Sequence, residues 1–342
     1  MKLRRKLTLL PNLRNKPAWS LTGLIIGLAA VFVGSLYIGR FPGVTIFEPF
    51  GFLEDNLAQR LVLNLRLPRL ITALLLGMSL SAAGTVLQMI FANPLIEPGF
   101  LGVSQGAAFG AAFSIIFLGS SAWMVQGMAG IFALLGLVFS YFLARRVRFG
   151  GWVLRLVMAG IAVSALFSAG VGVLKFFADP LSQLPEITFW MLGGLYSVTW
   201  NRLLAVLPAA LIGLFIMYRM RWRLNLLSLD DDVAFSLGAA PGRERAIVLF
   251  AAVLSTASLI SISGVIGWVG LIVPHIARRM FGADGRYSLP AAVLIGGIFT
   301  MISDVLARTL LAGEIPLGIL TSMIGSVFFI GLMLSRNIQV ER

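Results

Sequence analysis

The chain has 342 residues, of which 58% are hydrophobic and only 12% charged, with a formal net charge of +13. This apolar composition lies outside the range of soluble domains and indicates an integral membrane protein. The absence of cysteine excludes disulfides, thiolate metal sites, iron–sulfur clusters and cysteine nucleophiles. Because the basic residues lie between apolar blocks, the charge indicates orientation in a lipid bilayer and no nucleic-acid binding.

Apolar blocks recur along the whole sequence. A helical span needs roughly 20 apolar residues, so the chain has room for about ten spans and for no separate soluble domain. A basic tail, residues 1–17, precedes an apolar run at Ala18–Ile38 that is too long for a cleaved signal peptide. We expect one transmembrane domain over residues 1–342, all-α and in one bundle. The further spans are expected at Arg69–Phe91, Phe100–Leu118, Met124–Ala144, Val153–Phe177, Arg202–Tyr218, Ala246–Ser263, Val265–Ile276 (a short one), Leu289–Leu311 and Leu317–Ser335.

The basic residues are distributed unevenly between the two sides of this arrangement. An even number of spans places both termini on one side, and most lysines and arginines then fall in the tail and loops of that side. The positive-inside rule makes this side cytoplasmic. Residues 219–245, a polar island between two apolar blocks, therefore lie in the cytoplasm. Residues 174–200 become an extracytoplasmic connection, and residues 40–67 an extracytoplasmic segment with an interfacial helix.

The cytoplasmic island, residues 219–245, has helical periodicity. Ser228 or Asp230 can cap a helix whose first turn carries three aspartates, where carboxylates favour the positive end of the helix dipole. The helix should stop at Gly238, and a second helix should start after the turn at Pro241. A short helix, a turn and a second helix outside the membrane suit docking of a partner that moves them.

Three arginines and an aspartate mark the outer side. Arg66 and Arg69 open the second span against the charge bias, and they either extend to lipid headgroups or bind acidic side chains of an external partner. Asp304 and Arg308 lie four residues apart in the ninth span, so they share a helix face and can form an ion pair. Arg308 can pair inward at rest and outward with a partner.

Residues 88–102 interrupt helix between two spans, with two prolines and two glycines. Broken backbone at membrane depth is tolerated only against protein or water. Asn93–Glu97 is therefore a candidate for the cytoplasmic mouth of a pathway. Small residues in the spans on either side should allow close helix packing. They are Gly77, Ser81, Gly84, Gly102, Gly106 and Gly110.

The sequence lacks the motifs of several catalytic classes. It has no GxxxxGK[ST] phosphate loop, no HExxH, no GxSxG and no cluster of membrane-buried carboxylates. The single histidine, His275, has no visible ligand partners nearby, so no metal site is expected. An intramembrane enzyme and an ion-coupled carrier are therefore disfavoured, and the cytoplasmic segment indicates that energy arrives from another protein.

Several stretches together resemble the FecCD-type permeases of ATP-driven importers, which carry iron(III)–siderophores, haem, cobalamin and, in some members, molybdate or tungstate. The matching stretches follow the family order over nearly the whole chain. They are Arg66-Leu-Pro-Arg69, Asn93 to Gly106, Trp190-Met-Leu-Gly-Gly194, Leu226 to Gly238, Gly264 to Arg279 and Asp304 to Gly318.

The resemblance implies a homodimer of ten-helix subunits with cytoplasmic termini, the type II importer permease architecture, in the inner (cytoplasmic) membrane of a bacterium or archaeon. This chain would be a non-enzymatic transport subunit that binds no cofactor, with ATP and Mg on two partner ATPase subunits. The ATPases would grip the coupling residues Asp230, Asp231, Asp232, Ser236, Leu237, Gly238, Ala239, Pro241, Gly242 and Arg243. A substrate-binding protein would dock through glutamates at Arg66, Arg69 and Arg308. The gate and pathway candidates are Gln88, Asn93, Leu95, Glu97, Ser104 and Gln105.

The substrate does not follow from the fold. An iron(III)–siderophore is favoured because that class is the most populated in the family, and cobalamin, haem and molybdate or tungstate stay open. Two other classes of function are also open. An ATP-independent channel or secondary carrier would transport without the ATPase, and a membrane-bound sensor or scaffold would show no substrate flux.

Overall fold

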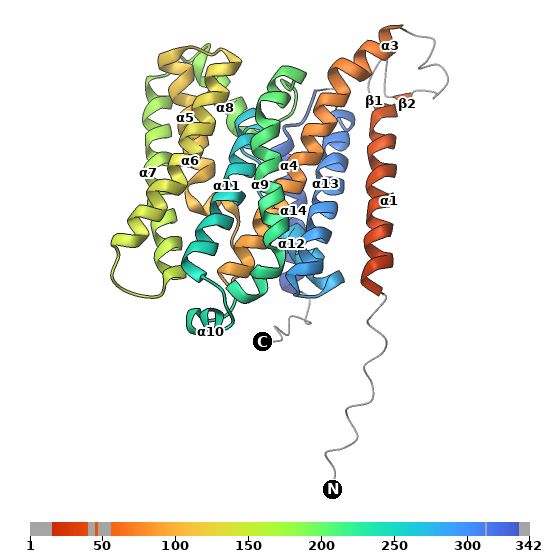
Figure 1. Ribbon diagram of the computed structural model, residues 1–342. Helices are drawn as coiled ribbons and strands as arrows, with labels where there is room; N and C mark the ends of the chain where they lie inside the picture. Colours follow the sequence, from red (N-terminus) through yellow and green to blue (C-terminus); the bar gives the residue numbers. More distant parts are fainter. Residues whose placement is uncertain (1–15, 40–44, 47–55, 312, 335–342) are drawn as a thin grey trace.

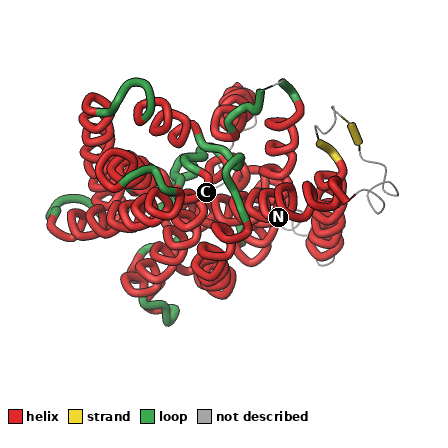
Figure 2. The backbone as a smooth tube through the Cα atoms, turned by 90° about the horizontal axis from the view of Figure 1, so that it is seen from above, coloured by secondary structure: helices red, strands yellow, loops and turns green. Residues whose placement is uncertain are grey.

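The computed structural model describes residues 16–39, 45–46, 56–311 and 313–334. Most of these residues are helical, as the apolar composition predicted, and helices stand side by side in one bundle (Figures 1 and 2). The helices are α1 (Lys16–Tyr37), α3 (Asn56–Leu61), the π-helical η1 (Val62–Arg66), α4 (Leu67–Ile90), the 3-10 helix η2 (Pro98–Leu101), α5 (Val103–Phe113), the π-helical η3 (Ser114–Leu118), α6 (Ala122–Arg146), α7 (Trp152–Phe177), α8 (Gln183–Leu192), α9 (Trp200–Leu227), α10 (Asp231–Ser236), α11 (Pro241–Ser263), α12 (Val269–Phe281), α13 (Gly285–Thr309) and α14 (Leu317–Leu334).

The predicted spans correspond to α1, α4, α5 with η3, α6, α7, α9, α11, α12, α13 and α14. Seven helices of the described chain are long and apolar enough to cross a membrane, while Val103–Leu118 and Leu317–Gly331 are shorter apolar helices. The short span expected at Val265–Ile276 begins later, because residues 264–267 have no regular structure and α12 starts at Val269. No separate interfacial helix is found in the described part of residues 40–67, because α3 and η1 continue directly into α4 and residues 59–90 form one helix. β1 (Ile38–Gly39) pairs antiparallel with β2 (Thr45–Ile46), which the sequence did not indicate.

Small residues bring the central helices into backbone contact. A Cβ atom added at Gly77 would lie 2.1 Å from the carbonyl oxygen of Gly296 in α13. At Gly84 it would lie 1.9 Å from the carbonyl oxygen of Gly270 in α12. At Gly106 it would lie 2.4 Å from the backbone of α6. These distances leave no room for a side chain, so the predicted close packing is confirmed and α4 lies at the centre of the bundle.

The connection expected over residues 174–200 contains a helix that the sequence analysis missed, α8. The Gly194 N–H donates to the Ser263 carbonyl (2.7 Å), and the Gly318 N–H donates to the Gly193 carbonyl (3.3 Å). Gly193 adopts a left-handed φ of 68° where its Cα approaches Gly264. These contacts fasten α8 both to the break before α12 and to the start of α14.

Candidate functional site

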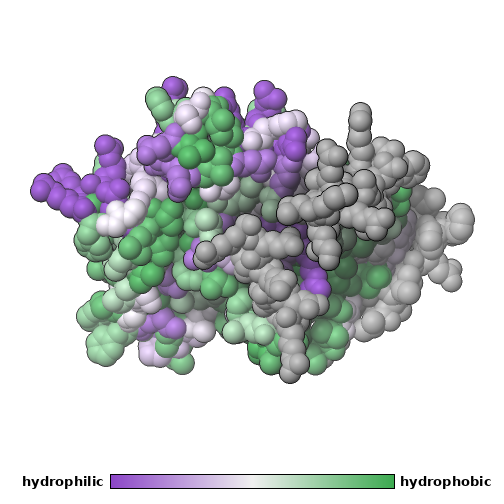
Figure 3. Space-filling model, turned by 90° about the horizontal axis from the view of Figure 1, so that it is seen from below, coloured by the Kyte–Doolittle hydropathy of each residue, from purple (hydrophilic) through white to green (hydrophobic). Residues whose placement is uncertain are grey.

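The short helix α10 projects from the lower edge of the bundle in Figure 1, the edge that also carries the α6–α7 connection. Figure 3 looks at this face and shows hydrophilic residues gathered along one edge of it. Helix α10 is bounded as the sequence predicted, with Gly238 in a left-handed conformation (φ 82°) just beyond its end and α11 starting at Pro241. The predicted cap is absent, because Asp230 occupies the N-cap position without a capping hydrogen bond and Ser228 donates to the Asn225 carbonyl.

One buried arginine holds α10 in place. Arg245, only 6% exposed, forms an ion pair with Asp231 and donates to the Leu227 carbonyl at 2.9 Å. A weaker bond of 3.4 Å reaches the Leu229 carbonyl, and the guanidinium lies 5.5 Å from the centre of the Trp152 ring. The end of α9, the start of α10 and the start of α11 therefore share one anchor.

Most of the other predicted coupling residues, between Asp232 and Arg243, are exposed to solvent. Val233, Phe235 and Leu237 are exposed although they are apolar, and Phe235 is the most exposed of the three, at 73%. Asp232, Ser236, Gly242 and Arg243 are exposed as well, whereas Ala239 and Pro241 are buried. The segment thus presents a small apolar surface on a fixed base.

A polar cluster joins the end of α9 that precedes α10 to the start of α13. Asp284 accepts from the Asn225 side-chain amide (2.7 Å), from the Arg286 N–H (2.9 Å) and from the Arg286 guanidinium (2.6 Å). Asn225 in turn accepts from the Gly285 N–H at 2.8 Å. The hydrogen bonds from Arg286 lower the pKa of Asp284 to about 2, so this carboxylate stays ionised at neutral pH. Sequence analysis missed this cluster because its members lie about 60 residues apart.

The three outer arginines gather at the opposite end of the bundle. Arg69 binds Asp304 through its Nε (2.8 Å) and Nη2 (2.7 Å) and also forms an ion pair with Glu314. The predicted pair between Arg308 and Asp304 is present at 3.2 Å, and Asp304 is only 1% exposed. Arg66 donates to the Leu36 carbonyl at 3.0 Å. The three arginines therefore bind groups of the protein itself. Glu314 is a partner of Arg69 that sequence analysis did not identify.

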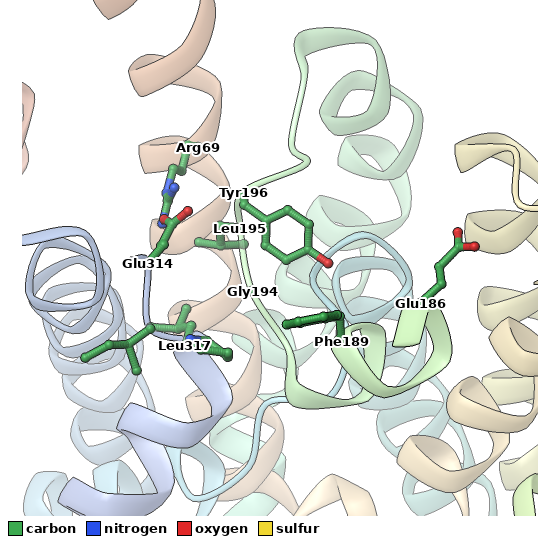
Figure 4. Close-up of a pocket in the computed structure, with 10 residues that line it drawn as sticks. Arg69, Glu186, Phe189, Gly194, Leu195, Tyr196, Glu314 and Leu317 are labelled. Carbon is green, nitrogen blue, oxygen red and sulfur yellow. The ribbon is translucent and has the colours of Figure 1, made fainter. Parts of the chain in front are cut away.

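A cavity of about 420 Å³ opens beside this network (Figure 4). Arg69 and Glu314 point toward one another on one side of it. Tyr196, from the α8–α9 connection, extends across, and α8 supplies Glu186 and Phe189. The cavity is lined by residues of three separate stretches, which only the tertiary structure brings together.

The interrupted segment after α4 lies where the sequence predicted a break. α4 ends at Ile90, and the backbone turns through residues 91–97 before η2. Asn93 accepts from the Leu95 N–H at 2.9 Å, and the Leu95 side chain is 51% exposed. Ser104 and Gln105 are half-buried in the first turn of α5.

Both ends of this interrupted segment bind α12. The Gln88 side-chain amide donates to the carbonyls of Gly270 and Leu271, both at 3.3 Å, and Gln88 accepts from Arg278 at 2.5 Å. The Glu97 carboxylate accepts from the Trp268 N–H at 3.2 Å. Thus two of the six gate candidates contact the same helix.

A second cavity, of about 600 Å³, lies between the interrupted segment, the end of α8, the break before α12, and α14. Glu97 and Trp268 line it together with residues of α14, including Met323 and Ser326. The sequence analysis assigned no role to Trp268 or to α14 here, because the apolar pattern of a span does not reveal which face lines a cavity.

The FecCD transport family matches residues 24–335 of the chain. A probable iron chelatin transport system permease protein from Helicobacter pylori is 39% identical over 80% of this chain and 82% of the relative. The molybdate import system permease protein MolB of Haemophilus influenzae is 38% identical over 90% and 93%. A solved inward-facing structure of a metal-chelate type ABC transporter aligns with a TM-score of 0.85 and 36% identity, covering 92% of this chain and 99% of that one. With its apolar helical bundle and its match over most of the sequence, this multi-pass membrane protein belongs to the FecCD transport family.

Proposed function

We propose that the protein is the transmembrane permease subunit of an ATP-driven importer that moves a metal chelate into the cytoplasm by alternating access. Two copies of the chain would surround the pathway, two ABC subunits would hydrolyse ATP with Mg on the cytoplasmic side, and a substrate-binding protein would deliver the substrate outside. The membrane would be the cytoplasmic (inner) membrane of a bacterium or archaeon. The names of the relatives, which include ABC and import permeases, support this proposal.

The observation that carries the proposal is the anchored but exposed helix α10. Its apolar side chains Phe235 and Leu237 are uncovered in a region outside the membrane spans, where exposed apolar patches mark protein contacts. The helix is continuous with α9 and α11 through short turns and the Arg245 anchor. Force applied to α10 by a closing ATPase pair would therefore reach two long helices directly.

At the other end, Arg66, Arg69 and Arg308 would receive glutamates of the binding protein. Their clustering within one network at the outer edge supports a single docking point rather than separate contacts with lipid headgroups. Each arginine has intramolecular partners, so docking would compete with these partners. Glu314, on the loop before α14, is the most accessible of the carboxylates that would be displaced, with 35% of its side chain exposed.

For the substrate we infer an iron chelate, most readily an iron(III)–siderophore. The Helicobacter pylori relative is described as an iron chelatin permease, and the cavities of about 420 and 600 Å³ suit a ligand larger than a simple ion. The Haemophilus influenzae relative, described as a molybdate import permease, has nearly the same sequence identity to this chain, 38%. Molybdate or tungstate, cobalamin and haem are therefore the competing substrates.

The first experiment is native mass spectrometry of the complex extracted from its own membrane, together with uptake into proteoliposomes. We expect two copies of this chain with two ATP-binding subunits, and uptake that requires ATP. The variant Phe235→Asp should lose the ATP-binding subunits, while Asp179→Asn, a change at an exposed polar position in the α7–α8 connection and outside the coupling residues, should retain them. Recovery of the chain without any nucleotide-binding partner, together with ATP-independent uptake, would establish a channel or carrier instead.

A substrate panel then separates the competing ligands. Proteoliposomes loaded with ATP and supplied with the complex's own binding protein are offered an ⁵⁵Fe-labelled siderophore, haemin, cobalamin or ⁹⁹Mo-molybdate. Accumulation of the iron label alone supports the proposed substrate class. Accumulation of molybdate alone would refute that class while leaving the ATP-driven import mechanism in place.

A further inference from the structure

Trp268 has an unusual backbone conformation for a bulky residue. Its φ is 71°, in the left-handed region, where a residue with a Cβ is strained and glycine is preferred. It lies immediately before α12 and lines the cavity of about 600 Å³. Strained residues of this kind persist only where the surroundings hold them, and they cluster at switch regions and ligand contacts.

The Glu97 carboxylate binds the backbone of this strained residue. It accepts from the Trp268 N–H at 3.2 Å, at the residue immediately before the first turn of α12. Glu97 comes from the interrupted segment, so the bond joins two parts of the chain that are 171 residues apart.

The interrupted segment is thereby bound to α12 at both of its ends. Gln88, before Asn93 and Leu95, binds the carbonyls of the first turn of α12, and Glu97, after them, binds the residue that precedes this turn. A displacement of the loop that carries Asn93 and Leu95 must therefore move α12 or break one of these contacts.

The Trp268 side chain in turn contacts α14. Its ring packs edge-on against Phe329, with 6.3 Å between the ring centroids. A Cβ atom added at Gly325 would lie 2.7 Å from the Trp268 Cβ, so no side chain larger than hydrogen fits between them. A change in the Trp268 backbone would therefore alter the α14 wall of the cavity.

We propose that Glu97 is a positioning residue that holds Trp268 in its left-handed conformation and so couples the Asn93–Leu95 loop to the α14 wall of the pathway. The proposal builds on the transport function proposed above, because it assigns the cavity to the pathway. The coupling of Glu97 to the Trp268 backbone can nevertheless be measured without substrate or ATPase. Glu97 acts as a hydrogen-bond acceptor, and its negative charge is secondary.

The test uses the absence of native cysteine, because a cysteine introduced at Ser326 is the sole thiol. The rate at which a maleimide modifies Ser326→Cys in the detergent-solubilised full chain reports the state of the cavity wall. Glu97→Ala should change this rate about tenfold, the effect of losing one hydrogen bond. Glu97→Gln, which keeps an acceptor, should stay within about twofold of the parent, as should Asp179→Ala, a control in an exposed loop.

A second pair of variants tests whether Glu97 acts through the backbone conformation of Trp268. In a Trp268→Gly background the left-handed conformation needs no support, so adding Glu97→Ala should change the labelling rate by less than about twofold. An equal effect of Glu97→Ala in both backgrounds would overturn the proposal, as would Glu97→Gln behaving like Glu97→Ala. The latter result would assign Glu97 to binding of a cationic group through its charge.

Uptake measurements then separate this inference from the proposed function. In the assembled complex, Glu97→Ala should lower ATP-dependent uptake about tenfold while ATP hydrolysis continues, and Glu97→Gln should transport normally. Absence of ATP-dependent uptake in the parent complex would refute the importer function but leave the labelling result valid. Normal uptake by Glu97→Ala in an active complex would refute the coupling role of Glu97.

Discussion

The outer arginine network and the cytoplasmic helix α10 use charge in opposite ways. At the outer end, Arg69 and Arg308 surround Asp304, which is 1% exposed, so the charges are satisfied within the protein. At the cytoplasmic end, Arg245 is the buried member of its pair, and Asp231 is 64% exposed at the tip of a helix whose apolar side chains are uncovered. In the proposed function, the surface around Asp304 would have to exchange existing partners to dock another protein, whereas the surface of α10 would be covered without such an exchange.

The largest expected effect comes from removing the centre of the outer network. Asp304→Ala leaves two mostly buried arginines without their shared carboxylate and should destabilise the protein by about 3–5 kcal/mol. Thermal unfolding in detergent measures this loss. Asp230→Ala, an exposed aspartate at the start of α10, is the control and should leave the unfolding temperature nearly unchanged. Equal effects of the two variants would show that Asp304 is not the centre of a buried network.

The anchor of α10 is expected to contribute less to global stability. Arg245→Met removes the hydrogen bonds to the Leu227 carbonyl and to Asp231, which should destabilise the local structure by about 1–3 kcal/mol. The affected part is a short segment at the surface, so protease cleavage near α10 should accelerate before the whole protein unfolds. Arg243→Met, at an exposed position in the same turn, should cleave like the parent. A parent-like cleavage rate in Arg245→Met would show that α10 is held by other contacts.

A smaller effect is expected where the outer network meets solvent. Glu314→Gln removes the partly exposed carboxylate that competes for Arg69, and an ion pair of this kind contributes about 1 kcal/mol or less. The proposed binding protein should therefore bind a few-fold more tightly, which biolayer interferometry at low salt can measure. Weaker binding would mean that the binding protein contacts Glu314 itself and that the pair with Arg69 is not displaced.

The smallest effect concerns the Asn225–Asp284 cluster. Because the folded-state pKa of Asp284 is about 2, below its ordinary value of 3.8, its contribution is complete above pH 3.8 and is lost only as pH falls toward 2. Protease cleavage at the α12–α13 loop should therefore be the same from pH 8 to pH 5. Asp284→Asn should increase cleavage at pH 7. A rise in cleavage of the parent between pH 7 and 5 would contradict this pKa.

Much of the architecture could be predicted from single features of the sequence. Apolar runs near the length of a bilayer span predicted the crossing helices, and the glycines of α4 and α5 predicted close packing. Gly238 and Pro241 predicted the end of α10 and the start of α11, because left-handed backbone and a fixed φ depend on the residue type alone. The Asp304–Arg308 pair followed from helical spacing, which is also a local property.

The contacts that join distant segments could not be predicted in the same way. Glu314 pairs with Arg69, Asn225 with Asp284, and Glu97 with Trp268, in each case across a long interval of sequence. Helix α8 was missed because its proline and its polar start are typical of a connection, and its packing on Gly264 and α14 stabilises it. A capping bond at Asp230 was expected from residue type, but the side chain does not make it.

The sequence by itself determined the long apolar helices, the breaks between helices and the family. These properties depend on transfer of apolar residues to lipid, on fixed backbone preferences and on the order of local motifs along the chain. The tertiary structure decided which charges are satisfied internally, which helix faces line the two cavities, and which backbone is held under strain. Those properties depend on side chains brought together from segments that are far apart in the chain, and no local pattern specifies their partners.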